Sequence, residues 1–146
     1  MKTELTLLEP GLLAASFAKV EAYLPDALRS IEAWCSLPST TRFEVGQFQG
    51  LVWLTDVIVG WKADIHVVIW DDEFRHRADL GKQVVQDLIK LFKLQRLSAF
   101  IPVTNEIAMR YAEKCGLHLE GVLRKAAIYD GGYIDIAAYS WAQGDD

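Results

Sequence analysis

The stretch that decides the fold runs from residue 105 to residue 124 and reads NEIAMRYAEKCGLHLEGVLR. Thr104 or Asn105 can cap a helix here, because a short polar side chain accepts a hydrogen bond from an amide N–H of the first turn. Apolar residues follow at helical spacing, and Gly116 stands where the end of a helix favours a positive φ. With a strand from about residue 117, the pattern predicts a helix, a turn and a strand.

The residues before this unit predict a crossover between two strands. Residues 96–101 read as a short strand that stops at Pro102, and apolar residues from about 77 to 92 recur at helical spacing. Residues 63–70 precede that helix and are apolar on both faces, which is typical of a central strand. A strand, a helix and a strand in this order pair in parallel through a right-handed crossover, so we expect the two strands to be neighbours.

The other strands are expected to be antiparallel. Two of them, over residues 43–48 and 51–59, precede the central strand, and the turns between all three are too short for a crossover helix. The last two, over residues 117–129 and 133–141, flank Asp-Gly-Gly at residues 130–132, which is a hairpin signal.

At the start of the chain, residues 3–8 alternate as in a strand, and two helices follow over about residues 13–24 and 26–37. The complete order predicts an α/β (α+β) fold. Its mixed, mostly antiparallel sheet has about seven strands with one parallel pair, and about four helices flank it. A chain of 146 residues has the size of one domain, so we expect a single domain over residues 1–146.

Charge and composition exclude several classes of protein. The net charge of −5 leaves no basic excess for binding nucleic acid through its phosphates. The sequence has no run of about 18 apolar residues and no signal peptide, so we expect a cytoplasmic protein that does not enter a membrane. His66, His76 and His118 lack metal-ligand spacing, and we expect no metal site. Cys115 belongs to the apolar face of its helix and is expected in the core.

A second pattern extends the opening stretch toward the end of the chain. It reads Asn105-x-x-Ala108-x-Arg110-x-x-Glu113-Lys114-x-Gly116, then Glu120-Gly121-x-Leu123-Arg124, Asp130-Gly131 and Asp135-x-x-x-Tyr139. These residues resemble the GNAT (Gcn5-related N-acetyltransferase) superfamily over roughly residues 50–141, and within it most resemble the ribosomal-protein-alanine N-acetyltransferases. Compact, divergent chains similar to this family also occur among bacteriophage genes.

The resemblance implies a site for acetyl-coenzyme A between two splayed strands, here 63–70 and 96–101. The pantetheine amides would pair with strand backbone, and the diphosphate would lie on the N-terminus of the following helix, where amide N–H groups and the helix dipole favour an anion. The residues that the resemblance implies for this site are Val68, Ile69, Trp70, Arg75, His76, Arg77, Leu80, Gly81, Lys82, Asn105 and Ala108.

The diphosphate segment departs from the family pattern, Gln/Arg-x-x-Gly-x-Gly/Ala. One register gives His76-x-x-Asp79-x-Gly81, and the other gives Arg75-x-x-Ala78-x-Leu80. In the first register Asp79 places a carboxylate where a diphosphate would approach. The segment is nevertheless the densest basic part of the chain, which leaves two interpretations open: a modified cradle held by side chains, or a solvated helix N-terminus.

The activity that the resemblance implies is acetyl transfer to a primary amine by direct attack. Asn105 is expected at the thioester, and Asp72 and Glu73 are expected to supply the general base, with Asp71, Glu44 and Glu120 as further candidates. The run of acids at residues 71–73 also fits a solvated loop at the end of the strand. Glu120 has a structural alternative, an ion pair with Arg124. The general acid stays unassigned. Ala112 occupies the position where many family members have a tyrosine, and Tyr111 lies about 100° round the helix from it.

A second class of function competes with the enzyme. The irregular diphosphate segment and Ala112 also fit a non-catalytic GNAT-fold binding or structural protein, for example one associated with a virion. The sequence does not identify the amine acceptor. Strand edges at the C-terminal hairpin favour a homodimer.

Overall fold

The computed structural model describes residues 5–7, 41–45, 50–69, 72 and 76–145. The two helices expected over about residues 13–37 lie outside these residues. The described elements, in chain order, are β1 (Leu5–Leu7), β2 (Thr41–Val45), β3 (Gly50–Ile58), β4 (Lys62–Ile69), α4 (Ala78–Phe92), β5 (Arg96–Pro102), α5 (Glu106–Lys114), β6 (His118–Tyr129) and β7 (Gly132–Ala142).

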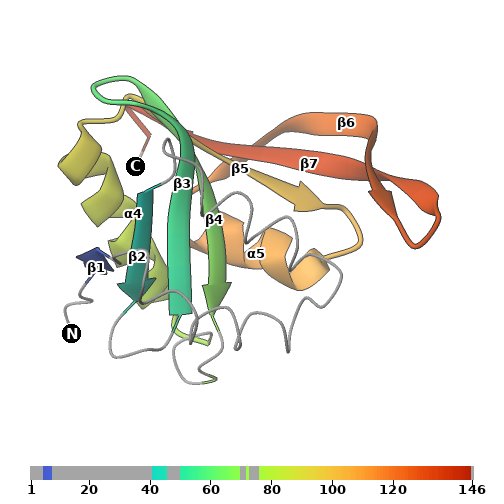
Figure 1. Cartoon of the computed structure of the whole chain (residues 1–146), viewed down its shortest axis with the longest axis horizontal. Coiled ribbons are helices and arrows are strands. Elements are labelled where there is room, and N and C mark those ends of the chain that lie inside the picture. The colour runs from blue at the N-terminus through green and yellow to red at the C-terminus, as the bar shows by residue number, and fades with distance from the viewer. Residues whose placement is uncertain (1–4, 8–40, 46–49, 70–71, 73–75, 146) are drawn as a thin grey trace.

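The strands form one sheet in the order β1-β2-β3-β4-β5-β7-β6 (Figure 1). Every neighbouring pair is antiparallel except β4 and β5, which run parallel on either side of the α4 crossover. The expected fold class, a mixed and mostly antiparallel sheet with one parallel pair, is therefore confirmed. The central position expected for the strand at residues 63–70, now β4, is confirmed too.

The parallel pair separates soon after it begins. Strands β4 and β5 pair only from Lys62 opposite Arg96 to Asp64 opposite Ser98. Both strands continue beyond this point, and their outer edges stay paired, β4 with β3 as far as Ile69 and β5 with β7 through its last residue. The facing edges of β4 and β5 beyond the short ladder thus have no strand partner among the described residues, and Val67 there is 42% exposed.

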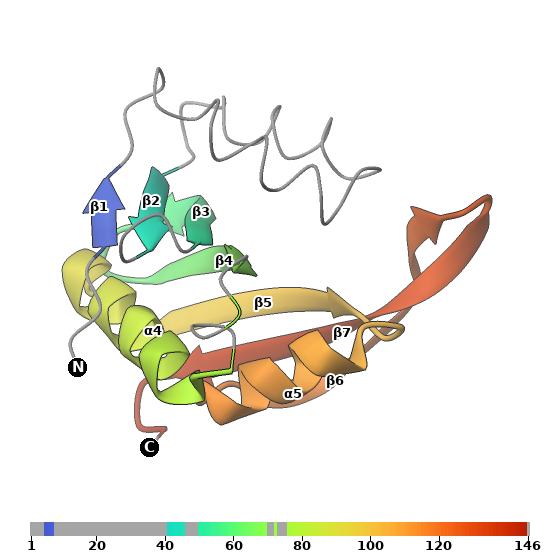
Figure 2. The same ribbon diagram turned by 90° about the horizontal axis from the view of Figure 1, so that it is seen from below.

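Helices α4 and α5 both cover one face of the sheet (Figure 2). Leu54 of β3, Leu97 of β5 and Leu88 of α4 are fully buried in the core that they enclose. Apolar side chains recur along α4 with the period of a helix, so one face of it is buried and the other is polar.

A close approach between the two helices depends on Gly81. A Cβ atom at Gly81 would lie 2.2 Å from the Tyr111 hydroxyl oxygen and 2.7 Å from the Cys115 sulfur. Cys115 is buried, as the sequence predicts. A side chain at this position would have to displace both the Tyr111 ring and the Cys115 thiol, so glycine permits the close approach of the two helices.

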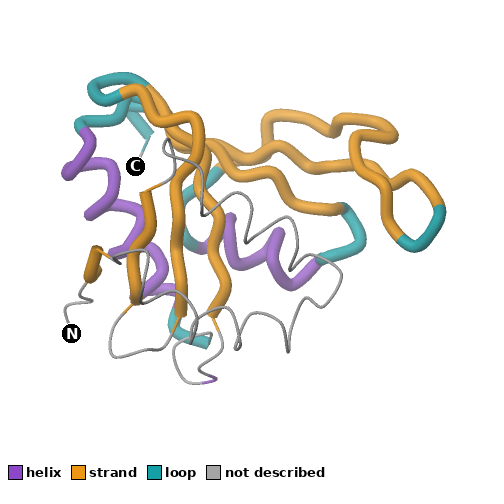
Figure 3. Tube along the Cα trace, in the orientation of Figure 1, coloured by secondary structure: helices purple, strands orange, loops and turns teal. Residues whose placement is uncertain are grey.

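The local signals around α5 and the last hairpin are confirmed. Asn105 caps α5, and Gly116 has a φ of 99°. Asp130 and Gly131 both have positive φ, as a two-residue hairpin turn with the twist of the flanking strands requires. The β6–β7 hairpin that they close is long and extends away from the rest of the sheet (Figure 3).

Candidate functional site

The point where β4 and β5 separate brings polar side chains together on the sheet face opposite α4 and α5. Successive side chains of a strand point to opposite faces. Ala63 and Ile65 of β4 face the helices and are buried, so Asp64 and His66 face the other way. Ser98 of β5 pairs with Asp64 and shares its face.

His66 is held by two neighbours on β3. Its Nε2 lies 2.9 Å from the Thr55 hydroxyl in a hydrogen bond, and its ring stacks on Trp53 with the ring centroids 5.2 Å apart and the planes 13° apart. Burial lowers the pKa of His66 to about 4, against a smaller opposing effect of Asp56. The imidazole is therefore neutral at pH 7 and acts as a hydrogen-bonding group rather than a cation.

The surroundings of Asp64 disfavour the charged form of its carboxyl group. Burial, first, and the neighbouring carboxyl of Asp56 raise its pKa above the usual range, while Lys62 and Arg96 oppose the shift. Asp56 has a φ of 52° at the irregular end of β3, where the register with β4 shifts. A carboxyl whose pKa is raised is a stronger base than an ordinary aspartate and is better suited to accept a proton.

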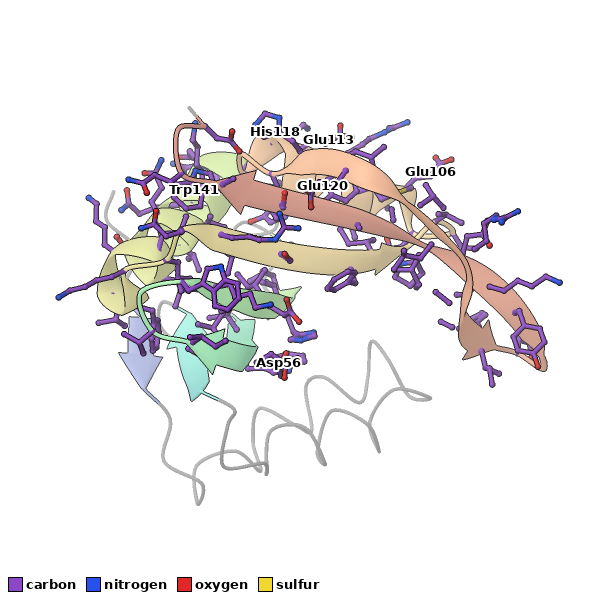
Figure 4. All side chains as sticks on the ribbon, turned by 90° about the horizontal axis from the view of Figure 1, so that it is seen from above. Asp56, Glu106, Glu113, His118, Glu120 and Trp141 are labelled. Carbon is purple, nitrogen blue, oxygen red and sulfur yellow. The ribbon has the colours of Figure 1, made fainter. Side chains whose placement is uncertain are left out.

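Arg96, whose charge acts on Asp64, forms an ion pair with Glu120. The Arg96 guanidinium donates two hydrogen bonds to Glu120, one of 3.1 Å from Nη1 to Oε2 and one from Nη2 to Oε1. In Figure 4, Glu120 and Asp56 lie on opposite sides of the β4–β5 pair. The predicted ion pair between Glu120 and Arg124 is wrong, because Arg96 is the partner. Arg96 also lowers the pKa of Glu120, which makes this carboxylate a weak base.

The structure describes only part of the set expected to catalyse. Asn105 Oδ1 accepts a hydrogen bond of 3.1 Å from the Ala108 amide, which is the capping contact. Asp72 is exposed, and its backbone carbonyl accepts from the His76 ring and amide. Glu73 and the side chain of Glu44 lie outside the described residues. The catalytic roles of Asn105, Asp72 and Glu73 thus stay predictions.

The basic segment expected to hold the diphosphate does not form one cluster. His76 Nδ1–H donates to the backbone carbonyl of Asp72 at 2.7 Å. Arg77 donates to both carboxylate oxygens of Asp79, at 2.9 and 2.8 Å. Lys82 lies beside Gly116, at the end of α5, where its Cε would be 3.8 Å from a Cβ at that glycine.

The other described residues expected at the cofactor lie on the buried face of α4 or in strand β4. Leu80 and Gly81 are on the buried face of α4. Ile69 belongs to β4 and packs against the core, and the backbone of Val68 lies in the same strand. Trp70, Arg75 and the side chain of Val68 lie outside the described residues. A role for these residues in binding coenzyme A remains a prediction.

Lys82 also lines a groove of about 320 Å³ between α4, the end of α5 and the end of β7.

Within the described ranges, no group of three or more histidine, cysteine, aspartate or glutamate side chains could hold a metal ion. No helix in the described part of the chain is long and apolar enough to cross a membrane.

The sequence prediction missed Asp64, His66, Asp56 and Arg96. A signal for two of them was present, since Asp64 and His66 are polar residues two apart in an otherwise apolar strand. Such residues share one face, and a polar group on a central strand requires partners. Asp56 and Arg96 had no comparable signal, because they reach the cluster through the pairing of other strands.

Comparison with known proteins defines the class of the fold. No protein-family model matches the chain, and no curated protein matches its sequence. Solved structures do match. A chimera of the Vibrio cholerae spermidine N-acetyltransferase SpeG with hSSAT has a TM-score of 0.78 and 20% identity, over 98% of this chain and 96% of that one. The fold is therefore the GNAT fold.

Two further structures of Vibrio cholerae SpeG match in the same way. Mutant forms of the spermidine/spermine N-acetyltransferase have a TM-score of 0.73 and 19% identity, over 97% of this chain and 95% of that one. A dodecameric structure of the spermidine N-acetyltransferase has a TM-score of 0.73 and 20% identity, over 97% and 94%. The expected likeness to the ribosomal-protein-alanine branch and a phage origin stay predictions.

Proposed function

We propose that the chain is an N-acetyltransferase that moves an acetyl group from acetyl-coenzyme A to a primary amine. The observation that carries the proposal is the separation of β4 and β5 after Asp64 and Ser98. Backbone N–H and C=O groups that lack a strand partner need another one. The pantetheine arm of coenzyme A has two amides that can supply such partners, and the fold is that of known N-acetyltransferases.

The residues of the chain fit the pantetheine arm of acetyl-coenzyme A better than its diphosphate. The facing edges of β4 and β5 offer backbone to the pantetheine arm. The start of α4 fits a diphosphate less well, because Arg77 is paired with Asp79. We therefore base the proposal on the arm and the thioester.

Asp64 is the base that we assign to the reaction, with Asp72 and Glu73 as the alternatives from sequence. The acceptor ammonium gives one proton to the Asp64 carboxylate, and its nitrogen then attacks the thioester carbonyl carbon. The C–N bond forms and the C–S bond breaks. The nitrogen loses its second proton as the amide forms, and the leaving thiolate takes up that proton to become the free thiol. Asn105 positions the donor at the start of α5, since placing the reactants alone can supply much of the rate.

The acceptor class follows from the charges around Asp64. Asp56, Asp64 and Glu120 contribute three carboxyls to this part of the sheet, and the whole chain carries a net charge of −5. An amine with further positive charges would be attracted to such a surface. The structural relatives act on spermidine, which is a molecule of this kind. We propose an alkyl polyamine as acceptor, with a protein N-terminus as the alternative.

Thiol release from acetyl-coenzyme A in the presence of spermidine tests the proposal. We expect Asp64→Asn to lower kcat/KM about 100-fold or more, because a general base typically contributes at least that factor. For the wild type, kcat/KM should rise with pH through a pKa above the usual aspartate range.

Asp72→Asn serves as the comparison variant. If it abolishes turnover and Asp64→Asn does not, the assignment of the base is wrong. If the wild-type chain acetylates neither spermidine nor peptide N-termini, the enzymatic function itself is wrong.

A non-catalytic GNAT-fold protein is the second candidate. Tyr111 favours it, because its hydroxyl is buried against Gly81 and Cys115 and cannot serve as the acid that Ala112 fails to provide. Burial raises the pKa of Tyr111 further above its ordinary value. Binding of acetyl-coenzyme A without turnover of any amine would support this candidate.

We also propose that the chain forms a homodimer through β6. This strand ends the sheet, and its apolar residues Leu119, Val122, Leu123 and Ile128 are about half exposed or more. A second copy would pair with the open edge and cover these side chains. The molecular mass in solution measures this directly. The single domain over residues 1–146 and a cytoplasmic location remain proposals as well.

A further inference from the structure

The first turn of α4 differs from an open anion site. An ordinary helix N-terminus offers unpaired amide N–H groups and the positive end of the helix dipole to an anion. In α4 one of these amides, that of Leu80, already donates to the carbonyl of Arg77 at 3.0 Å. The same turn carries the carboxylate of Asp79.

Asp79 is a fixed anion in this turn. Both of its carboxylate oxygens accept from Arg77, at 2.9 and 2.8 Å, so the guanidinium faces Asp79 with two of its donors. Arg77, first, and the amides of Asp79 and Leu80 lower the pKa of this carboxyl. The charge of Asp79 is therefore present throughout the neutral pH range.

The other described basic side chains of the segment lie apart from the Arg77–Asp79 pair. His76 donates from Nδ1 to the carbonyl of Asp72. Lys82 lies near Gly116 and Cys115, beside the groove that Asp145 also lines. Among the described residues, the charged pair that a diphosphate would meet at the start of α4 is the Asp79 carboxylate with the Arg77 guanidinium bound to it.

We propose that Asp79 is an internal anion that competes with the diphosphate of coenzyme A for the start of α4, so that the chain recognises its donor by the pantetheine arm rather than by the nucleotide. This inference rests on the proposed function, because it assumes that the arm binds between β4 and β5. The donor class it defines is an acyl thioester of pantetheine. Asp79 is then a residue that determines specificity, not a catalytic one.

Calorimetric titration of coenzyme A and of pantetheine tests the inference on the full chain. The variants are Asp79→Asn and, as the matched control, Asp87→Asn. Asp87 lies on the same helix, two turns further on, where it accepts a hydrogen bond of 2.8 Å from Gln83. Both substitutions remove one negative charge from α4 and keep the shape of the side chain.

Asp79→Asn should tighten the binding of coenzyme A about threefold or more, the size of effect that one charge has near an exposed helix terminus. The binding of pantetheine should stay within about twofold, and Asp87→Asn should change neither ligand's affinity. High salt should reduce the gain for coenzyme A, since exposed charges are screened.

Two outcomes overturn the inference, and they differ from the failure of the proposed function. If Asp79→Asn leaves the affinity for coenzyme A unchanged or weakens it, Asp79 does not compete with the diphosphate. If Asp87→Asn gives the same gain, only the net charge matters. If neither coenzyme A nor pantetheine binds to any of the three chains, the proposed function fails and this inference fails with it.

Discussion

The two faces of the sheet are built from the same strands and differ in almost every physical property. On the face covered by α4 and α5, β3, β4 and β5 contribute Leu54, Ile65 and Leu97, which pack in a continuous apolar core. On the opposite face the next residues along β4 and β5 are His66 and Ser98. One face therefore carries the apolar core that stabilises the fold, and the other carries the polar groups to which we assign the proposed chemistry.

The difference shows that one strand can stabilise the fold with the side chains on one face and hold polar groups with those on the other. Apolar burial stabilises the folded chain with few requirements on direction, whereas a buried polar group costs free energy unless a partner satisfies it. His66 has Thr55 as its partner. Trp53 Nε1 is buried without a hydrogen-bond partner among the described residues. Polar groups held at depth have shifted pKa values, which is what proton transfer requires.

The largest effect should come from the helix-covered face. Leu97 is fully buried, so Leu97→Ala should lower the free energy of unfolding by about 2–5 kcal/mol through lost burial and a residual cavity. Ser98→Ala, one residue along the same strand, should cost about 1 kcal/mol or less, because it removes only a hydroxyl group and leaves the packing of the Cβ atom in place. Urea denaturation of the two variants measures the difference. Equal losses would contradict the division of roles between the faces.

The next effect belongs to the polar face and depends on pH. The pKa of His66 is about 4 in the folded chain and about 6.5 when unfolded, so the unfolded chain binds more protons between these values. Folding stability should therefore be fully present above about pH 6.5 and fall as the pH drops toward 4. The loss should be on the order of 3 kcal/mol, since one pKa unit corresponds to about 1.4 kcal/mol.

Thermal unfolding of wild type and His66→Asn across this pH window checks the effect. The variant should lose the dependence that His66 causes, and His118→Asn should keep it, since His118 lies exposed on β6. An unchanged pH profile in His66→Asn would show that another group titrates.

The elements that the sequence predicted best depend on neighbours in the chain. The cap at Asn105, the positive φ of Gly116 and the turn at Asp130 and Gly131 are all set by residues within a few positions. The parallel pairing of β4 with β5 followed from element order, because only one handedness of crossover is common. Propensity and connectivity therefore sufficed for the GNAT sheet from β2 onward.

The site was harder to predict because adjacency in sequence is not adjacency in space. Arg77 and Lys82 looked like one basic cluster, yet five residues along a helix turn a side chain by about 140°. In the structure one pairs with Asp79 and the other lies beside Gly116. Arg96 and Glu120 are 24 residues apart and meet through the pairing of β5, β7 and β6, which no local pattern encodes.

The smallest effect should come from that ion pair. The side chains of Arg96 and Glu120 are 39% and 43% exposed, so water screens most of their attraction. Arg96→Gln should lower the free energy of unfolding by less than about 1 kcal/mol, and 1 M salt should remove most of the difference from wild type. The double variant with Glu120→Gln measures the coupling, because its loss should be smaller than the sum of the two single losses. A loss that is large and independent of salt would mean that the pair stabilises the sheet as a buried contact, and the polar face would then share in the stability assigned here to the helix-covered face.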